Sequence, residues 1–175
     1  AITKDSYAPT IRTRVGYTTA PLYGFQAMVE GVNVAAIGPE HNYNAAGSNG
    51  QGARPVVADP TMTRVDQAWV GYRYENWITT KVGQQPINLD NQRFIGDVGW
   101  RQNMQTFEAV SVGSEPIKNL NLHYSYVWEV NRVFGDVSGL PAANQDFDSN
   151  SHLINVSYSG WKYGRFVGYS YLLDL

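Results

Sequence analysis

The sequence contains no cysteine, which excludes a disulfide framework, a thiolate metal site and a cysteine nucleophile. Charged residues make up only 16% of the chain, well below the quarter or so that is usual in soluble domains. The net charge is -2, so no basic excess indicates a nucleic-acid partner. No apolar run reaches the length of about 18 residues that a membrane helix needs. These absences exclude a helical membrane protein. They do not exclude a membrane β-barrel, because barrel strands alternate in polarity and keep the hydropathy low.

Aromatic residues are plentiful instead, at 13% of the chain, with 12 tyrosines and 5 tryptophans. A length of 175 residues predicts a single domain over residues 1–175. Residues 1–10 have neither the basic start nor the apolar run of a signal peptide, and the last residues stop within a strand-like pattern. We therefore expect a section of a longer barrel, without its signal peptide, its first strand and its later strands.

Apolar and polar residues alternate with a period of two, which predicts β-strands. Eight such segments lie near residues 11–17, 25–30, 67–74, 78–82, 106–112, 120–129, 154–158 and from 163 onward. Long connections at about 36–63, 84–103 and 132–151 alternate with short turns, as in outer-membrane barrels. Aromatic residues fall near several strand ends, as interfacial girdles require: Tyr17, Tyr23, Tyr74, Trp77 and Tyr163. The predicted fold class is all-β, a transmembrane antiparallel up-and-down β-barrel.

In such a barrel each strand has a lipid face and a lumen face. A charged side chain on the lipid face costs about 2–4 kcal/mol at the bilayer midplane, so the charged strand residues are assigned to the lumen. They are Arg12, Arg14, Glu30, Arg73, Lys81, Glu108 and Glu129. Val167, Tyr169, Tyr171 and Leu173 share one face of the last strand. Basic and acidic groups on opposite walls would create a transverse field that discriminates among charged solutes. The alternative is that these charges only pair with one another.

The loop from Asn88 to Asn103 is unusually rich in polar side chains. We expect it to fold into the pore and help form a constriction, because long barrel loops can narrow the lumen. Arg93 and Arg101 would contact anionic solutes through bidentate hydrogen bonds, and Asp90 and Asp97 would orient these arginines. The alternative is a loop held at the barrel rim by Asp–Arg pairs.

Two other classes of protein fit the strand pattern. A complete eight-stranded barrel would have an interior filled by side chains and a structural, adhesive or small-ligand role. A soluble carbohydrate-binding β-sandwich would also alternate with a period of two and use many aromatic residues.

No catalytic or metal site and no cofactor is expected. His41 and His152 fall in or near loops. His123 and Ser125 share a strand face with Glu129, but residues two apart on a strand lie about 7 Å apart along it, a poor distance for a direct hydrogen bond. Asp146, Asp148 and Asn150 have calcium-loop spacing but lack the glycine and the later glutamate of that motif.

Residues 83–110, GQQPINLDNQRFIGDVGWRQNMQTFEAV, resemble the alginate-export-type family of Gram-negative outer-membrane porins. The resemblance extends to TIRTRVGY at 10–17, PVVADP at 55–60 and VNRVFG at 130–135. It implies a barrel of about eighteen strands in the outer membrane, through which small hydrophilic solutes, including anions, diffuse passively. The implied partners are outer-membrane lipid, such solutes, and a second copy or a companion chain that completes the barrel.

Overall fold

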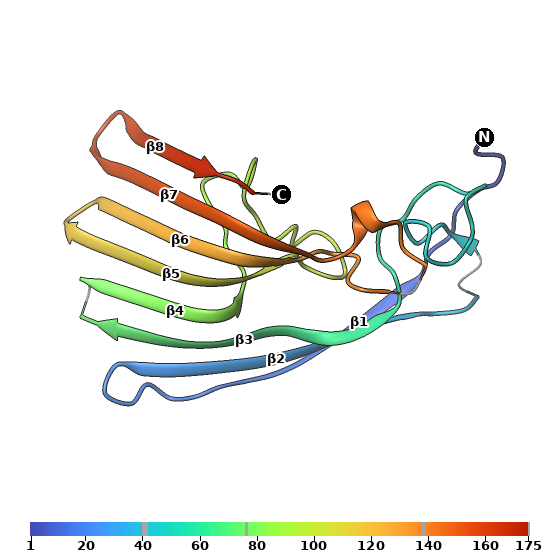
Figure 1. Ribbon diagram of the computed structural model, residues 1–175, viewed down its shortest axis with the longest axis horizontal. Helices are drawn as coiled ribbons and strands as arrows, with labels where there is room; N and C mark the ends of the chain where they lie inside the picture. Colours follow the sequence, from blue (N-terminus) through green and yellow to red (C-terminus); the bar gives the residue numbers. More distant parts are fainter. Residues whose placement is uncertain (40–41, 76, 138, 175) are drawn as a thin grey trace.

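The computed structural model describes residues 1–39, 42–75, 77–137 and 139–174. It contains one antiparallel sheet of eight strands in the order β1-β2-β3-β4-β5-β6-β7-β8 (Figure 1). The strands are β1 (Thr10–Thr18), β2 (Phe25–Ala36), β3 (Met62–Tyr74), β4 (Ile78–Gln85), β5 (Thr106–Ile117), β6 (Leu120–Asn131), β7 (Phe147–Trp161) and β8 (Gly164–Leu172). A short 3-10 helix, η2 (Ala142–Asn144), lies between β6 and β7. The predicted all-β, up-and-down fold is confirmed. Within the described residues, no helix has both the length and the apolar character to cross a bilayer.

Short hairpins join the strands at one end of the sheet, and the long connections lie at the other end (Figure 1). In the first hairpin, Tyr23 and Gly24 have φ values of 50° and 86°, and Leu22 and Phe25 exchange two backbone hydrogen bonds of 2.9 Å. Positive φ at both central residues is the signature of a mirror-image turn whose twist matches that of the strands. Glu75 and Asn119 also have positive φ at the tight turns that follow β3 and β5. The predicted alternation of short turns and long loops is therefore confirmed.

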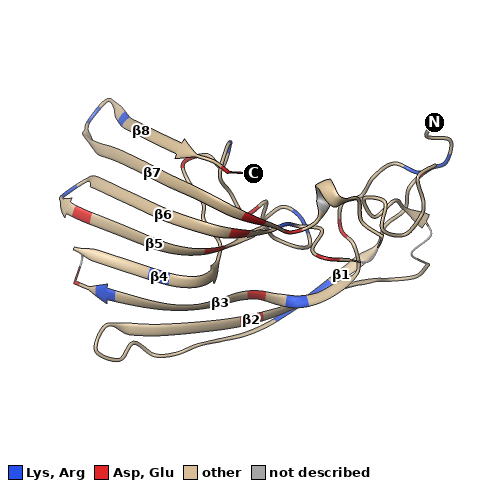
Figure 2. Ribbon diagram, in the orientation of Figure 1, with Lys and Arg blue, Asp and Glu red and all other residues tan. Residues whose placement is uncertain are grey.

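The two faces of the sheet differ in polarity. On one face, Ala27, Val70, Val82 and Val110 are successive partners in the strand register and form an apolar row across β2 to β5. Val70 and Val82 are 55% and 51% exposed, so nothing within the described chain covers this row. We call this the outer face. Charged residues concentrate at the strand ends and in the loops, and the middle of the sheet carries few of them (Figure 2).

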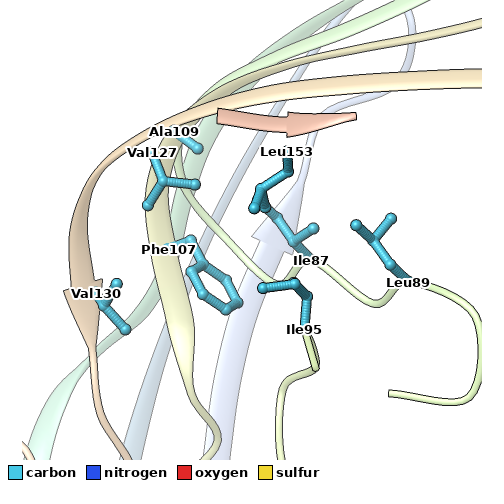
Figure 3. Close-up of a cluster of buried hydrophobic side chains, with 8 residues drawn as sticks. All are labelled: Ile87, Leu89, Ile95, Phe107, Ala109, Val127, Val130 and Leu153. Atoms are coloured by element: carbon cyan, nitrogen blue, oxygen red, sulfur yellow. The ribbon is translucent and has the colours of Figure 1, made fainter. Parts of the chain in front are cut away.

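The other face, called the inner face, carries the buried core. The β4–β5 loop, residues 86–105, returns over it and contributes Ile87, Leu89 and Ile95 to a cluster of buried side chains (Figure 3). The strand residues of the cluster are Phe107, Ala109, Val127, Val130 and Leu153. The loop is therefore packed against the wall by burial of apolar surface, which stabilises this arrangement by roughly 25 cal/mol per Å².

Several strands start earlier, or end later, than the sequence pattern predicts. β3 begins at Met62 and β7 at Phe147, whereas β4 continues to Gln85. The alternation is interrupted by bulges at Glu30/Gly31, Glu108/Ala109 and Val127/Glu129. A bulge adds one residue to a strand and reverses which residues face inward beyond it. The extra residue at Trp128 accounts for the wrongly predicted phase of Glu129.

Candidate functional site

The inner face holds the β4–β5 loop by hydrogen bonds from arginines of the wall to the backbone of the loop. On β1, Arg12 donates to the carbonyl oxygens of Arg101 and Gln102 at 3.1 and 3.0 Å. Gln102 donates back to the Thr10 hydroxyl at 2.8 Å. Arg12 is therefore on the inner face, where it positions the loop.

A four-residue ionic network lies beside this contact. Arg14 is 2.5 Å from Glu30 and 3.3 Å from Asp66, and the Nε of Arg64 is 3.4 Å from the other carboxylate oxygen of Asp66. The Asp66 side chain is 1% exposed. Arg64 also donates to the carbonyl oxygens of Met104 and Arg132. It thereby joins two long loops to the wall, and the network neutralises most of its own charge.

Asp97 and Arg101 serve mainly to shape the loop. Asp97 accepts a hydrogen bond of 3.0 Å from the Asn88 amide, and its backbone N–H donates to the Asn88 side-chain oxygen at 2.8 Å. Arg101 lies 3.8 Å from Asp59 of the β2–β3 loop. At Asp97 and Arg101, these contacts favour the alternative in which the loop is held at the barrel rim over direct contact with a solute.

Asp90 and Arg93 lie at the opposite end of the loop, toward β8. Asp90 is 3.3 Å from Arg165 and accepts a 2.7 Å hydrogen bond from the Asn155 side chain. Arg93 is exposed and stacks on Phe94, with its guanidinium carbon 5.6 Å from the ring centroid. The structure thus brings Asp90 and Arg93 to one groove and places Asp97 and Arg101 elsewhere.

Arg73 and Lys81 form a second basic region near the short turns. The Lys81 ammonium lies 4.4 Å from the centroid of the Trp69 ring, a cation–π contact. Arg73 and Lys81 line a groove of about 360 Å³ with Trp69 and Thr79. Both residues are therefore on the same face of the sheet as Trp69.

Glu108 and Glu129 are on the outer face, which corrects the expectation that they line the lumen. Phe107 and Ala109 both belong to the inner cluster, so the residue between them points the other way. Glu108 is the register partner of Glu129 and accepts a 2.8 Å hydrogen bond from the Trp128 indole. The bulge at Trp128 reverses the phase of Glu129. Both carboxylates lie where β5 and β6 meet the long loops rather than in the middle of the strands.

His123 and Ser125 do form a direct hydrogen bond, of 2.8 Å, contrary to the expectation from their spacing. Side chains on one strand face can lean toward each other and close the distance between their backbones. Ser125 is fully buried and also hydrogen-bonds Ser111 at 2.7 Å. Because Glu129 is on the outer face, it cannot complete a triad with this pair.

The remaining histidines and the acidic loop do not add a site. His152 hydrogen-bonds the Tyr124 hydroxyl at 2.9 Å, and His41 lies outside the described residues. Asp146 accepts a 2.5 Å hydrogen bond from the Arg132 backbone N–H, and its burial raises the pKa of the carboxyl above its usual range. The part of the chain that the structure describes contains no group of three residues able to hold a metal ion.

Five inner-face residues were missed by sequence reasoning: Arg64, Asp66, Arg165, Tyr169 and Tyr171. Arg64 and Asp66 fall between the expected loop at 36–63 and the expected strand at 67–74, although Arg64-Val65-Asp66 already alternates and could have extended the strand. Tyr171 pairs in register with Leu153 of the inner cluster, so Val167, Tyr169 and Tyr171 share the inner face. Leu173 lies beyond the end of β8.

Comparison with solved structures identifies the fold. The crystal structure of Pseudomonas aeruginosa OccD3 (OpdP) superposes with a TM-score of 0.60 at 16% sequence identity. The match covers 94% of this chain and 36% of that chain, so the chain spans about a third of the neighbour's length. No protein-family profile matches the sequence, and no curated protein matches it.

Proposed function

We propose that the chain forms part of an outer-membrane porin through which small hydrophilic solutes, anions among them, diffuse passively. The observation that carries the proposal is the difference between the two faces. The outer face presents an exposed apolar row, and the inner face presents paired charges, amides and a loop packed against the wall. A sheet with apolar residues exposed on one side and polar residues on the other suits a wall between lipid and water.

The edges of the sheet support a wider barrel. Among the described residues, β1 pairs only with β2, and β8 pairs only with β7. Unpaired backbone groups at an edge are not tolerated within a bilayer. We propose that further strands, a second copy or a companion chain pair with these edges. Membership of the alginate-export-type family is part of this proposal and rests on the sequence run at 83–110.

The two rival architectures receive less support. A complete eight-stranded barrel requires β1 to pair with β8, and the described strands do not do so. A soluble sandwich requires a second sheet over the apolar face, whereas the described strands form one sheet and Val70 and Val82 remain half exposed.

A preference for anions follows from the balance of charge on the inner face. The basic side chains there outnumber the acidic ones, and the acidic ones are each within 3.5 Å of an arginine. The basic residues are Arg12, Arg14, Arg64, Arg73, Lys81, Arg93 and Arg165, and the acidic residues are Glu30, Asp66 and Asp90. A net positive lining raises the local concentration of anions in a water-filled pore.

Channel formation is the direct test. The full-length protein that contains this chain, extracted from outer membranes in detergent, should insert into planar lipid bilayers and give stepwise, ohmic conductance in KCl. The protein should also fractionate with the outer membrane. A preparation that is monodisperse without detergent and produces no conductance steps would contradict the porin proposal.

Removing the positive charge of Arg93 should reduce anion selectivity. A unit charge acts on an ion about 5 Å away with roughly 0.8 kcal/mol in water, and less when salt screens it, so Arg93→Ala should change the permeability ratio of Cl⁻ to K⁺ about twofold. The measurement is the reversal potential in a KCl gradient. Lys118→Ala is the matched control, because it removes the same charge from the short turn between β5 and β6 and should leave the reversal potential unchanged.

A further inference from the structure

A groove of about 530 Å³ lies between the β4–β5 loop and the inner face of β8. Its lining includes three aromatic rings and three charged groups. These are Phe94, Tyr169 and Tyr171, and Asp90, Arg93 and Arg165. The groove is distinct from the basic region at Arg73 and Lys81, which lines a different hollow near the short turns.

The aromatic rings form one continuous platform. Tyr169 and Tyr171 stack with centroids 4.8 Å apart and an interplanar angle of 21°. Phe94 of the loop lies 5.7 Å from Tyr169 and 6.5 Å from Tyr171. Phe94 and Tyr169 are 59% and 53% exposed. These rings are on the inner face, away from the apolar row of the outer face, and aromatic rings that line a groove can pack against the flat face of a ligand.

The charged groups beside the platform can both donate and accept hydrogen bonds. Asp90 lies 3.3 Å from Arg165, and its other oxygen accepts the 2.7 Å hydrogen bond from Asn155. The Asp90–Arg165 pair therefore adds no net charge to the groove. The exposed guanidinium of Arg165 still has N–H groups that can donate hydrogen bonds, and each carboxylate oxygen of Asp90 has a further lone pair that can accept one.

We propose that this groove is a binding subsite for the ring of a neutral sugar, a step that rests on the proposed porin function and names a class of solute for it. One face of a pyranose ring is a flat array of C–H groups and packs on an aromatic ring. Its hydroxyls both donate and accept hydrogen bonds, which matches the paired carboxylate and guanidinium at the groove wall.

The chemistry of the groove favours a neutral sugar over a carboxylate solute. Asp90 lies at the groove wall, where its negative charge opposes the attraction of the exposed Arg93 for an acidic ligand. Arg165 is already partnered by Asp90, so a carboxylate would have to displace that partner. A neutral polyol can instead bridge the two groups and leave their ion pair intact.

The test measures block of the ion current by a neutral sugar. Maltotriose added to bilayers that contain the full-length protein should reduce the KCl current in a saturable way. Tyr169→Ala should raise the half-blocking concentration about tenfold. The sugar loses one of the aromatic rings on which it packs, and the expected factor corresponds to about 1.4 kcal/mol of binding free energy. Block is expressed as the fraction of each variant's own KCl current without sugar. The matched control is Phe166→Ala, which removes a ring of β8 that is 59% exposed and pairs in register with Tyr158 of the outer face.

The outcomes separate the sugar subsite from the porin proposal. Absence of conductance steps contradicts the porin proposal itself. Conductance without block by maltotriose, or block that Tyr169→Ala does not weaken, overturns the sugar subsite alone. The neutral-sugar assignment is overturned if glucuronate blocks the current more strongly than glucose does and Tyr169→Ala weakens the block by glucuronate. Asp90→Asn then serves as a second variant, since Asn tolerates the φ of 52° at this position and removes only the charge. It should strengthen block by glucuronate severalfold.

Discussion

Replacing Arg64 with methionine should destabilise the barrel wall by about 3 kcal/mol, the lower end of the cost of breaking a buried ion pair by removing one partner. Asp66 is 1% exposed, and Arg14, at 3.3 Å, would be its remaining cationic neighbour. The variant also loses the hydrogen bonds that Arg64 donates to the carbonyl oxygens of Met104 and Arg132. We therefore expect the β4–β5 loop to detach from the wall and the single-channel conductance to increase and become noisier.

The control for this prediction separates the buried charge from the loop contacts. In the double variant Arg64→Met/Asp66→Asn, no buried carboxylate is left uncompensated, so much of the lost stability should return in urea unfolding from lipid vesicles. The contacts of Arg64 with the loop are absent from both variants. Both should therefore have a higher conductance than the unmodified protein, and trypsin should cut both faster after Arg93 and Arg101. If both variants keep the conductance of the unmodified protein, Arg64 does not hold the loop in place.

Much of the fold follows from local alternation. Along β1 to β4 the outer residues Val15, Val29, Val70 and Val82 were all predicted to lie on the apolar face, because each of these strands repeats the period of two over several residues. The first turn was also predictable from its short length and from Gly24, which is suited to positive φ, whereas the positive φ of Tyr23 and Glu75 had no signal in the sequence.

Phase errors arose where the alternation is broken or ambiguous. Glu129 was assigned to the lumen by counting along β6, but the bulge at Trp128 reverses the count, and a bulge leaves no clear mark in one sequence. On β8 both faces carry aromatic residues, with Phe166 on one and Tyr169 on the other. Apolar character alone therefore could not decide which face meets lipid, and only the pairing of Tyr171 with Leu153 decides it.

The candidate groove depends on contacts between distant parts of the sequence. Asp90 and Arg165 are 75 residues apart, and nothing in either local pattern pairs them. For the loop from Asn88 to Asn103, its polarity favoured two alternatives equally, a constriction in the pore and a loop held at the barrel rim by Asp–Arg pairs. The sequence did not predict that Ile87 and Ile95 would anchor the loop in a buried cluster, because isolated apolar residues in a loop have no period to interpret.

Replacing Val82 with lysine should cost about 2–4 kcal/mol of stability in a bilayer if the outer face meets lipid near its midplane. Val82 lies between Val70 and Val110 in the apolar row and is 51% exposed, so a lysine fits there without steric conflict. The cost comes from the charge of the lysine, which would lie in the hydrocarbon of the bilayer. Urea unfolding from lipid vesicles should show this loss.

Met28→Lys is the matched control, because Met28 pairs with Trp69 on the inner face and lies two residues from Glu30. A lysine there would stand in the water-filled lumen near an opposite charge, so the stability in vesicles should change by no more than about 0.5 kcal/mol. If the outer face meets water instead of lipid, the result for Val82 reverses, because an added charge on a water-exposed strand is close to neutral. Equal and small effects of the two lysines would therefore show that the apolar row does not face lipid, and this would remove the main support for a membrane barrel.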